Sequence, residues 1–347
     1  MTIENHVELV RRFQAGWWED VWLIRVNGQL RVRKELHRPD APWAREAFVK
    51  EWDYLRGLPE ELHPPFVRVV GQCDDLLSDR PPSDRALWFD MEYLAGYTNV
   101  PTLLGEGRIG PADAERIQDL LIDALMNRLY RIPGDPFEPD RILWKVMQEV
   151  VDFATADADL APYANAACWV INGVGCPRLR ETIPAARYDE RVRQPLENSP
   201  AVRLHGDLFY ENVMYRPDPP SIGLIDPVSV AGVATGPVVF DRAKFHSWTT
   251  GELYALRHNR FELRADPAGS SPRVEYAWVR TDPVVRALRE IDLSGRLLAA
   301  MDERIGPSDA AQAVLGAYFH LVMVPNTPMP QKLLRYARAT EILARWG

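Results

Sequence analysis

The segments HGDLFYENV, residues 205–213, and IGLIDP, residues 222–227, decide the fold of this chain. The end of the first segment and the start of the second are apolar and flank a proline-rich turn at residues 217–221, which predicts a hairpin. The hairpin carries Asp226 back towards Asn212. The two segments are therefore expected to gather their polar side chains in one place.

Those polar side chains are the ones that phosphoryl transfer requires. The reaction needs a base or orienter for the attacking hydroxyl, placed beside ligands for the magnesium that carries the nucleotide phosphates. Asp207 suits the first role, and Asn212 and Asp226 suit the second.

Two other interpretations compete with this one. A His-Gly-Asp triplet alone is typical of a turn in which the aspartate accepts local backbone hydrogen bonds. A His-x-Asp pair also occurs in metallohydrolases, which normally use further histidines. The spacing to Asn212 and Asp226 disfavours both, and the remaining histidines are scattered: His6, His37, His63, His246, His258 and His320.

The pattern H-G-D-x-x-x-x-N, followed by an apolar strand and an aspartate, resembles the aminoglycoside phosphotransferase family of the protein-kinase-like superfamily. Pro227 departs from the commonest pattern, in which an aromatic residue or glycine follows the metal aspartate. The combination of Tyr-Glu-Asn-Val with Ile-Asp-Pro is most similar to the streptomycin-type branch. The resemblance implies ATP as phosphate donor, with GTP as an alternative, and Mg²⁺ as the metal.

An N-terminal hairpin is predicted by residues 21–34, where Asn27-Gly28 separates two alternating apolar runs. Period-two alternation puts Lys34 on the face of Leu30 and Val32, with Arg31 and Arg33 on the other face. A lysine on the apolar face is costly unless it has a charged partner. The alternative is that Lys34 has no charged partner and extends at the edge of the sheet so that its amino group reaches water.

The partner is expected on the next helix, residues 43–58, where Glu51 falls in an apolar stripe formed by Ala44, Phe48, Leu55 and Leu58. Glu46 lies on the polar side. The resemblance implies that Lys34, held by Glu51, positions the nucleotide phosphates. It also puts residues 13–20, which contain one glycine, in the place of a phosphate-covering loop.

The strand at residues 86–96 is similar in position to the one that leads into the hinge of kinase-like folds. By that resemblance the carbonyl of Glu92 and the amide of Leu94 contact adenine. Beyond Asp226, residues 232–245 match the family's G…D-x-A segment. Asp241 is implied to brace the catalytic loop, with a helix N-cap as the alternative, and His205 is implied to be a bracing histidine.

Apolar periodicity predicts helices at residues 111–131, 141–153, 288–298, 310–323 and 330–346. The acidic, proline-rich residues 133–140 are expected to be a connector, with substrate contact as the alternative.

Composition narrows the class of protein. At 347 residues the chain exceeds a single core, and its net charge of −8 argues against a nucleic-acid partner. The start lacks the regions of a signal peptide, and no apolar run approaches a membrane span, so we expect a cytoplasmic protein without a membrane partner. The three cysteines form no disulfide or metal pattern.

These observations predict an α+β, bilobal protein-kinase-like fold: a small sheet-and-helix lobe at residues 1–95 and a mainly helical lobe at residues 96–347. The expected activity is phosphorylation of a hydroxyl on a small molecule, with an alcohol group as acceptor. The resemblance favours an aminoglycoside or another sugar-containing, nucleoside-type antibiotic. A sugar or amino-sugar kinase of metabolism and a catalytically silent nucleotide-binding regulator are the alternatives, and the oligomeric state is left open.

Overall fold

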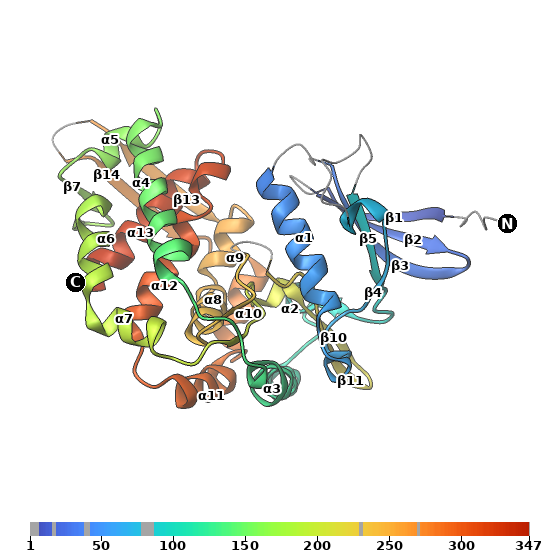
Figure 1. Cartoon of the computed structure of the whole chain (residues 1–347). Helices are drawn as coiled ribbons and strands as arrows, with labels where there is room; N and C mark the ends of the chain where they lie inside the picture. Colours follow the sequence, from blue (N-terminus) through green and yellow to red (C-terminus); the bar gives the residue numbers. More distant parts are fainter. Residues whose placement is uncertain are drawn as a thin grey trace.

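A five-stranded antiparallel sheet builds the smaller, N-terminal lobe (Figure 1). Its strands, in spatial order, are β1 (Val7–Ala15), β2 (Glu19–Val26), β3 (Gln29–Leu36), β5 (Leu87–Glu92) and β4 (Val69–Gln72). The computed structural model describes residues 7–15, 19–37, 42–77, 87–228, 232–268 and 271–346. Within these residues the predicted fold class is confirmed.

The predicted hairpin is the β2–β3 pair, in which Val26 pairs with Gln29. Asn27 and Gly28 close it with φ values of 50° and 85°, the left-handed conformations that a tight hairpin turn requires. Strand β1 was not predicted. It includes Phe13, which the sequence analysis assigned to the phosphate-covering loop. Residues 16–18 of that loop lie outside the described residues, as does Ala86, the first residue of the strand predicted at residues 86–96.

Helix α1 (Pro42–Arg56) covers one face of this sheet and lies between it and the larger lobe (Figure 1). Its apolar stripe is buried as the periodicity predicts, and the Phe48 ring packs against Phe89 of β5 at a centroid distance of 4.9 Å. Phe89 pairs in register with Lys34 on β3. The helix stripe therefore faces the strands that carry Lys34.

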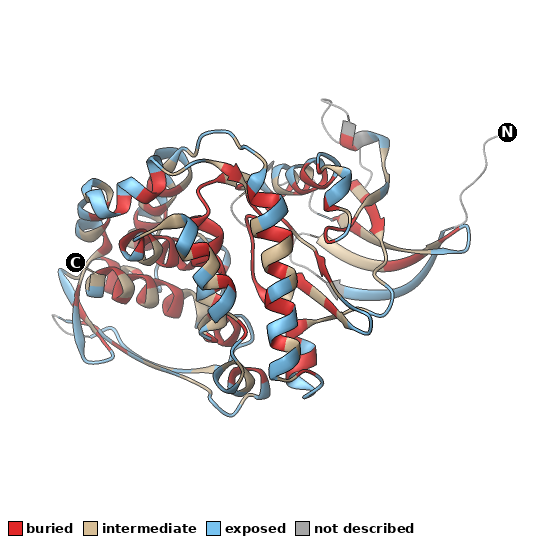
Figure 2. Cartoon of the chain, turned by 90° about the horizontal axis from the view of Figure 1, so that it is seen from below, coloured by how far each residue is buried: buried red, intermediate tan, exposed pale blue. Residues whose placement is uncertain are grey.

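Helices dominate the C-terminal lobe, and its buried segments concentrate where these helices meet (Figure 2). They are α2 (Val100–Gly105), α3 (Pro111–Ile122), α4 (Lys145–Ala156), α5 (Ala161–Ala164), α6 (Leu179–Tyr188), α7 (Glu190–Glu197), α8 (Val239–Thr249), α9 (Glu252–Arg257), α10 (Pro283–Glu290), α11 (Gly295–Ile305), α12 (Asp309–Leu321) and α13 (Gln331–Trp346). No helix among the described residues is long and apolar enough to cross a membrane. The predicted boundary at residues 95 and 96 falls between β5 and the next strand, β6 (Thr98–Asn99).

Short turns of other helical types extend the longer helices. A π-helical segment (Asp123–Arg128) and a 3₁₀ turn (Leu129–Arg131) continue α3, so the predicted helix at residues 111–131 is unbroken but changes type. A π-helical segment (Asp140–Trp144) leads into α4. Further 3₁₀ turns lie at Glu60–Leu62, Asp74–Leu77, Tyr210–Asn212 and Val324–Asn326.

The predicted helix at residues 288–298 is wrong. Helix α10 ends at Glu290 and α11 begins at Gly295. Between them the Asp292 carboxylate accepts hydrogen bonds from the N–H groups of Ser294 (2.9 Å) and Gly295 (2.8 Å). An aspartate that satisfies the backbone two and three residues ahead favours a turn over a continuing helix.

Three small sheets complete the larger lobe. Strands β10 (Val213–Pro217) and β11 (Pro220–Leu224) form the hairpin predicted before Asp226, and β6 pairs with β10. Strand β9 (Val202–Arg203) pairs with β12 (Thr235–Gly236). A four-stranded sheet that the sequence did not predict combines β13 (Phe261–Asp266), β14 (Arg273–Trp278), β7 (Cys168–Ile171) and β8 (Val174–Pro177).

Candidate active site

The loop at residues 205–212 depends on a glycine. Gly206 has a φ of 78°, and a Cβ built there would lie 2.2 Å from the carbonyl oxygen of Val233. Any side chain would therefore clash with backbone as well as impose an unfavourable conformation. Gly206 lets the chain turn so that Asp207 follows β9 at the edge of the larger lobe.

Asp241, in the first turn of α8, holds this turn in place. Its carboxylate accepts hydrogen bonds from the N–H groups of His205 (2.7 Å) and Gly206 (2.8 Å) and from the hydroxyl of Tyr130 (3.0 Å). Asp241 is fully buried, and burial raises its pKa to about 6. The side chain contacts the loop as the resemblance implied, and it makes no N-cap hydrogen bond to α8.

His205 is also buried, and burial lowers its pKa to about 4. The imidazole is therefore neutral near pH 7. Its Nδ1 accepts a hydrogen bond from the N–H of Asp207 at 3.3 Å. This contact orients the loop and fits the bracing role better than a proton shuttle.

Asn212 joins the two aspartates. Its Nδ2 donates to the backbone carbonyl of Asp207 at 3.0 Å and, more weakly, to that of Asp226 at 3.5 Å. Asp226 has a φ of 52° and Val228 a φ of 62°, both unfavourable for these residue types. The structure therefore brings Asp207, Asn212 and Asp226 together and holds the last in a strained conformation.

Lys34 lies against three carboxylates. Its Nζ is 2.7 and 2.8 Å from the two carboxylate oxygens of Glu51, 2.7 Å from Asp226 Oδ1 and 3.5 Å from Glu19 Oε1. Lys34 and Glu51 are both buried. The ion pair expected between β3 and α1 is present, and it extends to the aspartate at the end of the β10–β11 hairpin.

The charges in this cluster are unbalanced. Burial alone lowers the pKa of Lys34, but the carboxylates of Asp226, Glu19 and Glu51 outweigh burial and raise that pKa well above its usual value. Burial raises the pKa of Glu51 to about 8 despite the neighbouring lysine. Three carboxylates therefore face a single lysine, and burial and their mutual repulsion disfavour the ionised forms of Glu19 and Glu51.

A second cation, such as a magnesium ion, would relieve the repulsion between these carboxylates. Asp226 and Asn212 offer the oxygen ligands that Mg²⁺ prefers, and Mg²⁺ is commonly held by one or two carboxylates together with substrate phosphates. Within the described ranges, no group of three or more His, Cys, Asp or Glu side chains could hold a metal.

Helix α1 is tied to the catalytic loop as well as to the sheet. The Tyr54 hydroxyl donates to the carbonyl of Leu204 at 2.7 Å. The Arg203 guanidinium donates to the carbonyls of Tyr54 (2.9 Å) and Gly57 (3.0 Å). The helix that carries Glu51 is thus fixed to the residues that precede Asp207.

The two predicted hinge residues lie at the junction of the lobes. Glu92 ends β5, and its N–H donates to the carbonyl of Arg68 at 3.0 Å. The Leu94 side chain packs on Gly223, where a Cβ would lie 2.3 Å from Leu94 Cδ1. Their contact with adenine stays a prediction.

Lys244 is a site residue that the sequence interpretation missed. Its Nζ is 2.8 Å from Asp207 Oδ1, and both side chains are almost fully buried. Lys244 follows Asp241 by three residues on α8, a spacing that puts both on one helix face. That spacing is the signal that could have identified it.

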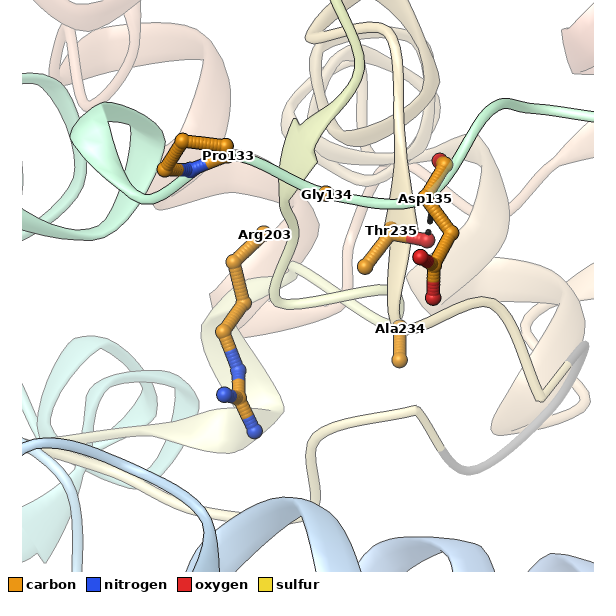
Figure 3. Close-up of a pocket in the computed structure, with 6 residues that line it drawn as sticks. All are labelled: Pro133, Gly134, Asp135, Arg203, Ala234 and Thr235. Carbon is orange, nitrogen blue, oxygen red and sulfur yellow. Dashed lines mark hydrogen bonds between the residues drawn. The ribbon is translucent and has the colours of Figure 1, made fainter.

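A pocket of about 460 Å³ opens beside β9, between the chain at residues 133–135 and the chain at residues 234–235 (Figure 3). The Arg203 side chain points from this pocket towards α1, and the Thr235 hydroxyl donates to the carbonyl of Asp135. None of the lining residues is a predicted site residue. Pro133 pairs with Val202 of β9 and the Gly134 N–H donates to the carbonyl of Ala201, so this segment packs on β9, and its role as a connector stays a prediction.

Known proteins match this chain in structure, while no family model matches its sequence. No curated protein matches the sequence either. A structure from Ralstonia eutropha, assigned as an aminoglycoside phosphotransferase, has a TM-score of 0.50 and 14% identity, over 99% of this chain and 92% of that chain. A structure from Haemophilus somnus, assigned as a fructosamine-3-kinase, has a TM-score of 0.51 and 13% identity, over 98% of this chain and 92% of that chain.

This chain has the bilobal protein-kinase-like fold. At 13–14% identity the similarity establishes the fold alone. The assignment of Lys34 and Glu51 to a nucleotide-binding ion pair, and of Asp207, Asn212 and Asp226 to catalytic and metal-binding groups, stays a prediction.

The Lys34–Glu51 pair gives a first test of these positions. Lys34→Met should raise the KM for nucleotide by about tenfold or more, because the phosphates lose their buried cation. Glu51→Gln should give a milder form of the same defect, since Asp226 and Glu19 still hold Lys34. Steady-state kinetics at varied nucleotide concentration measure both effects.

Arg25→Met is the matched control, because Arg25 is an exposed residue on the same sheet that pairs with Glu8. Arg33 is unsuitable: its guanidinium makes a two-pronged ion pair with the buried Asp90 at 2.7 and 3.0 Å. A nucleotide KM in Lys34→Met equal to that of the wild type would contradict the assignment.

Proposed function

We propose that this protein is a phosphotransferase that moves the γ-phosphate of ATP, or of GTP as the alternative donor, to an alcohol group of a small molecule with the help of Mg²⁺. One observation carries the proposal: residues from β3, α1, the catalytic loop and the β10–β11 hairpin converge so that Lys34 contacts both Glu51 and Asp226. Lys34 is buried and contacts one carboxylate from each lobe, and a lysine in such a position can hold the phosphates of a nucleotide.

Each group has a defined task in such a transfer. Asp207 orients the acceptor hydroxyl and accepts its proton late in the reaction. Asn212 and Asp226 would hold the magnesium, which neutralises charge on the phosphates when it is bound. Lys34 positions the nucleotide phosphates, and Lys244 holds the Asp207 carboxylate in place through the 2.8 Å contact. Catalysis then rests on positioning and charge neutralisation.

The acceptor belongs to the polyhydroxylated small molecules. The resemblance in the catalytic loop supports an aminoglycoside, of streptomycin type, or another sugar-containing antibiotic. A sugar or amino-sugar kinase of metabolism uses the same catalytic groups. A protein acceptor is disfavoured, since only a short segment separates Asp226 from Asp241.

The deciding experiment measures ATP consumption and phosphorylated product with a panel of aminoglycosides, nucleoside antibiotics, sugars, amino sugars and sugar acids. We expect product with at least one acceptor and only in the presence of Mg²⁺. Nucleotide binding without product for any acceptor would favour a catalytically silent regulator. Binding of neither nucleotide nor Mg²⁺ would contradict the proposal outright.

A further inference from the structure

A buried arginine without a partner lies in the interior of the larger lobe. Arg335, on α13, is 4% exposed, and its Nε and Nη1 have no hydrogen-bond partner among the described residues. Nor does any carboxylate of the described ranges form an ion pair with it. Burial, together with the nearby Arg257, lowers the pKa of Arg335 to about 9, so the group still carries its charge near pH 7.

A second donor without a partner lies near Arg335. His320, on α12, is 4% exposed, and its Nδ1 has no hydrogen-bond partner in the described part of the chain. Burial and the charges of Arg335, Arg338 and Lys244 hold the pKa of His320 well below its usual value. A neutral imidazole can still donate one N–H to an anion.

The surrounding cations connect this pair to the catalytic loop. Lys244 lies over the rings of Phe209 (5.2 Å) and Phe319 (5.0 Å), and Arg257 lies over Phe209 at 5.0 Å. Phe209 is two residues from Asp207. The helices that carry these side chains, α8, α9, α12 and α13, pack together in the centre of the larger lobe (Figure 1).

The carboxylates that face this cluster are already engaged. Asp207 contacts Lys244 at 2.8 Å. Glu211 pairs with Arg257 at 2.8 Å and with His258 at 3.0 Å. Farther along α13, Arg338 is neutralised by Glu252 and Glu341, each at 2.8 Å. Each of these carboxylates is therefore paired with another cation, and none of them neutralises the positive charge of Arg335.

An uncompensated guanidinium is costly to bury, and a bound oxyanion would offset that cost. The planar fork of an arginine matches the two oxygens of a carboxylate or phosphate. These cations come from helices of the larger lobe, whereas Lys34 comes from the smaller lobe. The cluster thus lies in the same lobe as Asp207 and joins it through Lys244, whereas the lysine that would hold the nucleotide contacts Asp226.

We propose that Arg335, assisted by Arg257 and His320, binds an oxyanionic group of the acceptor, a carboxylate or a phosphate, while the acceptor hydroxyl lies at Asp207. The acceptor is then an anionic hydroxyl compound, such as a sugar acid or sugar phosphate, and not a polycationic aminoglycoside. This inference rests on the proposed phosphotransferase function and specifies its substrate class.

Sulfate is a suitable first probe. Its binding is measured by calorimetry with the nucleotide site filled by a non-hydrolysable ATP analogue and Mg²⁺, at ionic strength kept constant with chloride. Arg335→Met should weaken sulfate binding at least tenfold, and Arg335→Lys should weaken it less. Arg264→Met, which removes an exposed arginine of β13, should leave binding unchanged.

The thermal stability of the variants separates loss of the site from loss of the fold. Arg335→Met without ligand should melt no lower than the wild type, because the substitution removes a buried charge that has no carboxylate partner. Sulfate should raise the melting temperature of the wild type but not that of Arg335→Met. Failure of the wild type to bind sulfate, or equal binding by Arg335→Met, would overturn the proposal.

Matched acceptors then test the substrate class. Glucuronate, glucose 6-phosphate, glucose and glucosamine share a hexopyranose ring and differ mainly in charge, and the first two distinguish a carboxylate from a phosphate site. An anionic acceptor should show a KM at least tenfold higher in Arg335→Met than in the wild type. A preferred acceptor that is neutral or cationic, with a KM unaffected by Arg335→Met, would refute the anionic class. Sulfate binding that depends on Arg335, without phosphorylation of any compound, would support the anion site and count against the proposed function instead.

Discussion

Asp207→Asn should reduce turnover by about a thousandfold, the middle of the range for loss of a general base. The substitution preserves shape but removes the group that orients the hydroxyl and accepts its proton. Asp207 lies against Lys244, whereas Lys34 lies against Asp226, so the affinity for magnesium nucleotide should stay within about twofold of the wild type. Single-turnover kinetics and calorimetry with a non-hydrolysable nucleotide measure the two quantities.

Lys244 supplies the control for folding. Asp207→Asn leaves Lys244 buried without its carboxylate, and breaking a buried pair in this way costs about 3–5 kcal/mol. The double variant Asp207→Asn, Lys244→Met should regain stability and remain inactive. If stability and turnover recovered together, Asp207 would be structural and not catalytic.

Asp226→Asn should abolish transfer through a different defect. The carboxylate is the charged member of the proposed metal site, so its loss should weaken magnesium-nucleotide binding roughly tenfold to a hundredfold, the range seen for groups that support a metal. Turnover should fall at least as much as in Asp207→Asn at ordinary nucleotide concentrations. Calorimetric titration with Mg²⁺ and a non-hydrolysable nucleotide decides the point.

The stability of Asp226→Asn is informative as well. Lys34 keeps its contacts with Glu51 at 2.7 Å and Glu19 at 3.5 Å, and the repulsion of Asp226 on these two carboxylates is removed. The variant without ligand should therefore melt no lower than the wild type. Binding of the metal nucleotide equal to that of the wild type would show that Asp226 is not a metal ligand.

The N-terminal hairpin and the helix that follows it could be predicted from sequence because both depend on local periodicity. Alternation put Lys34 on the apolar face, and a three- and four-residue repeat put Glu51 in the apolar stripe, where the structure joins them. Likewise a turn between two apolar runs fixed the β10–β11 hairpin, and with it the approach of Asp226 to Asn212. In each case the spacing along the chain sets the geometry.

The four-stranded sheet of the larger lobe could not be predicted from spacing along the chain. Strand β14 pairs in parallel with β7, with Arg273 opposite Val170. Neither short run identifies a partner so far away in the sequence. The break between α10 and α11 was missed for a related reason. The apolar period continues across it, while the N–H groups of Ser294 and Gly295 donate to the Asp292 carboxylate and form a turn.

The sequence by itself determined two separate groups, Lys34 with Glu51 and Asp207 with Asn212 and Asp226, because short-range spacing and turn chemistry place the members of each. The contact between Lys34 and Asp226, which joins the two groups, comes from the tertiary structure. Only the tertiary structure decided how the remaining charges are paired. Lys244 lies against Asp207, while Arg335 is buried with no carboxylate beside it among the described residues. Both outcomes depend on how α8, α12 and α13 pack around Phe209 and Phe319, and the cost of a buried charge depends on neighbours that lie far away along the chain.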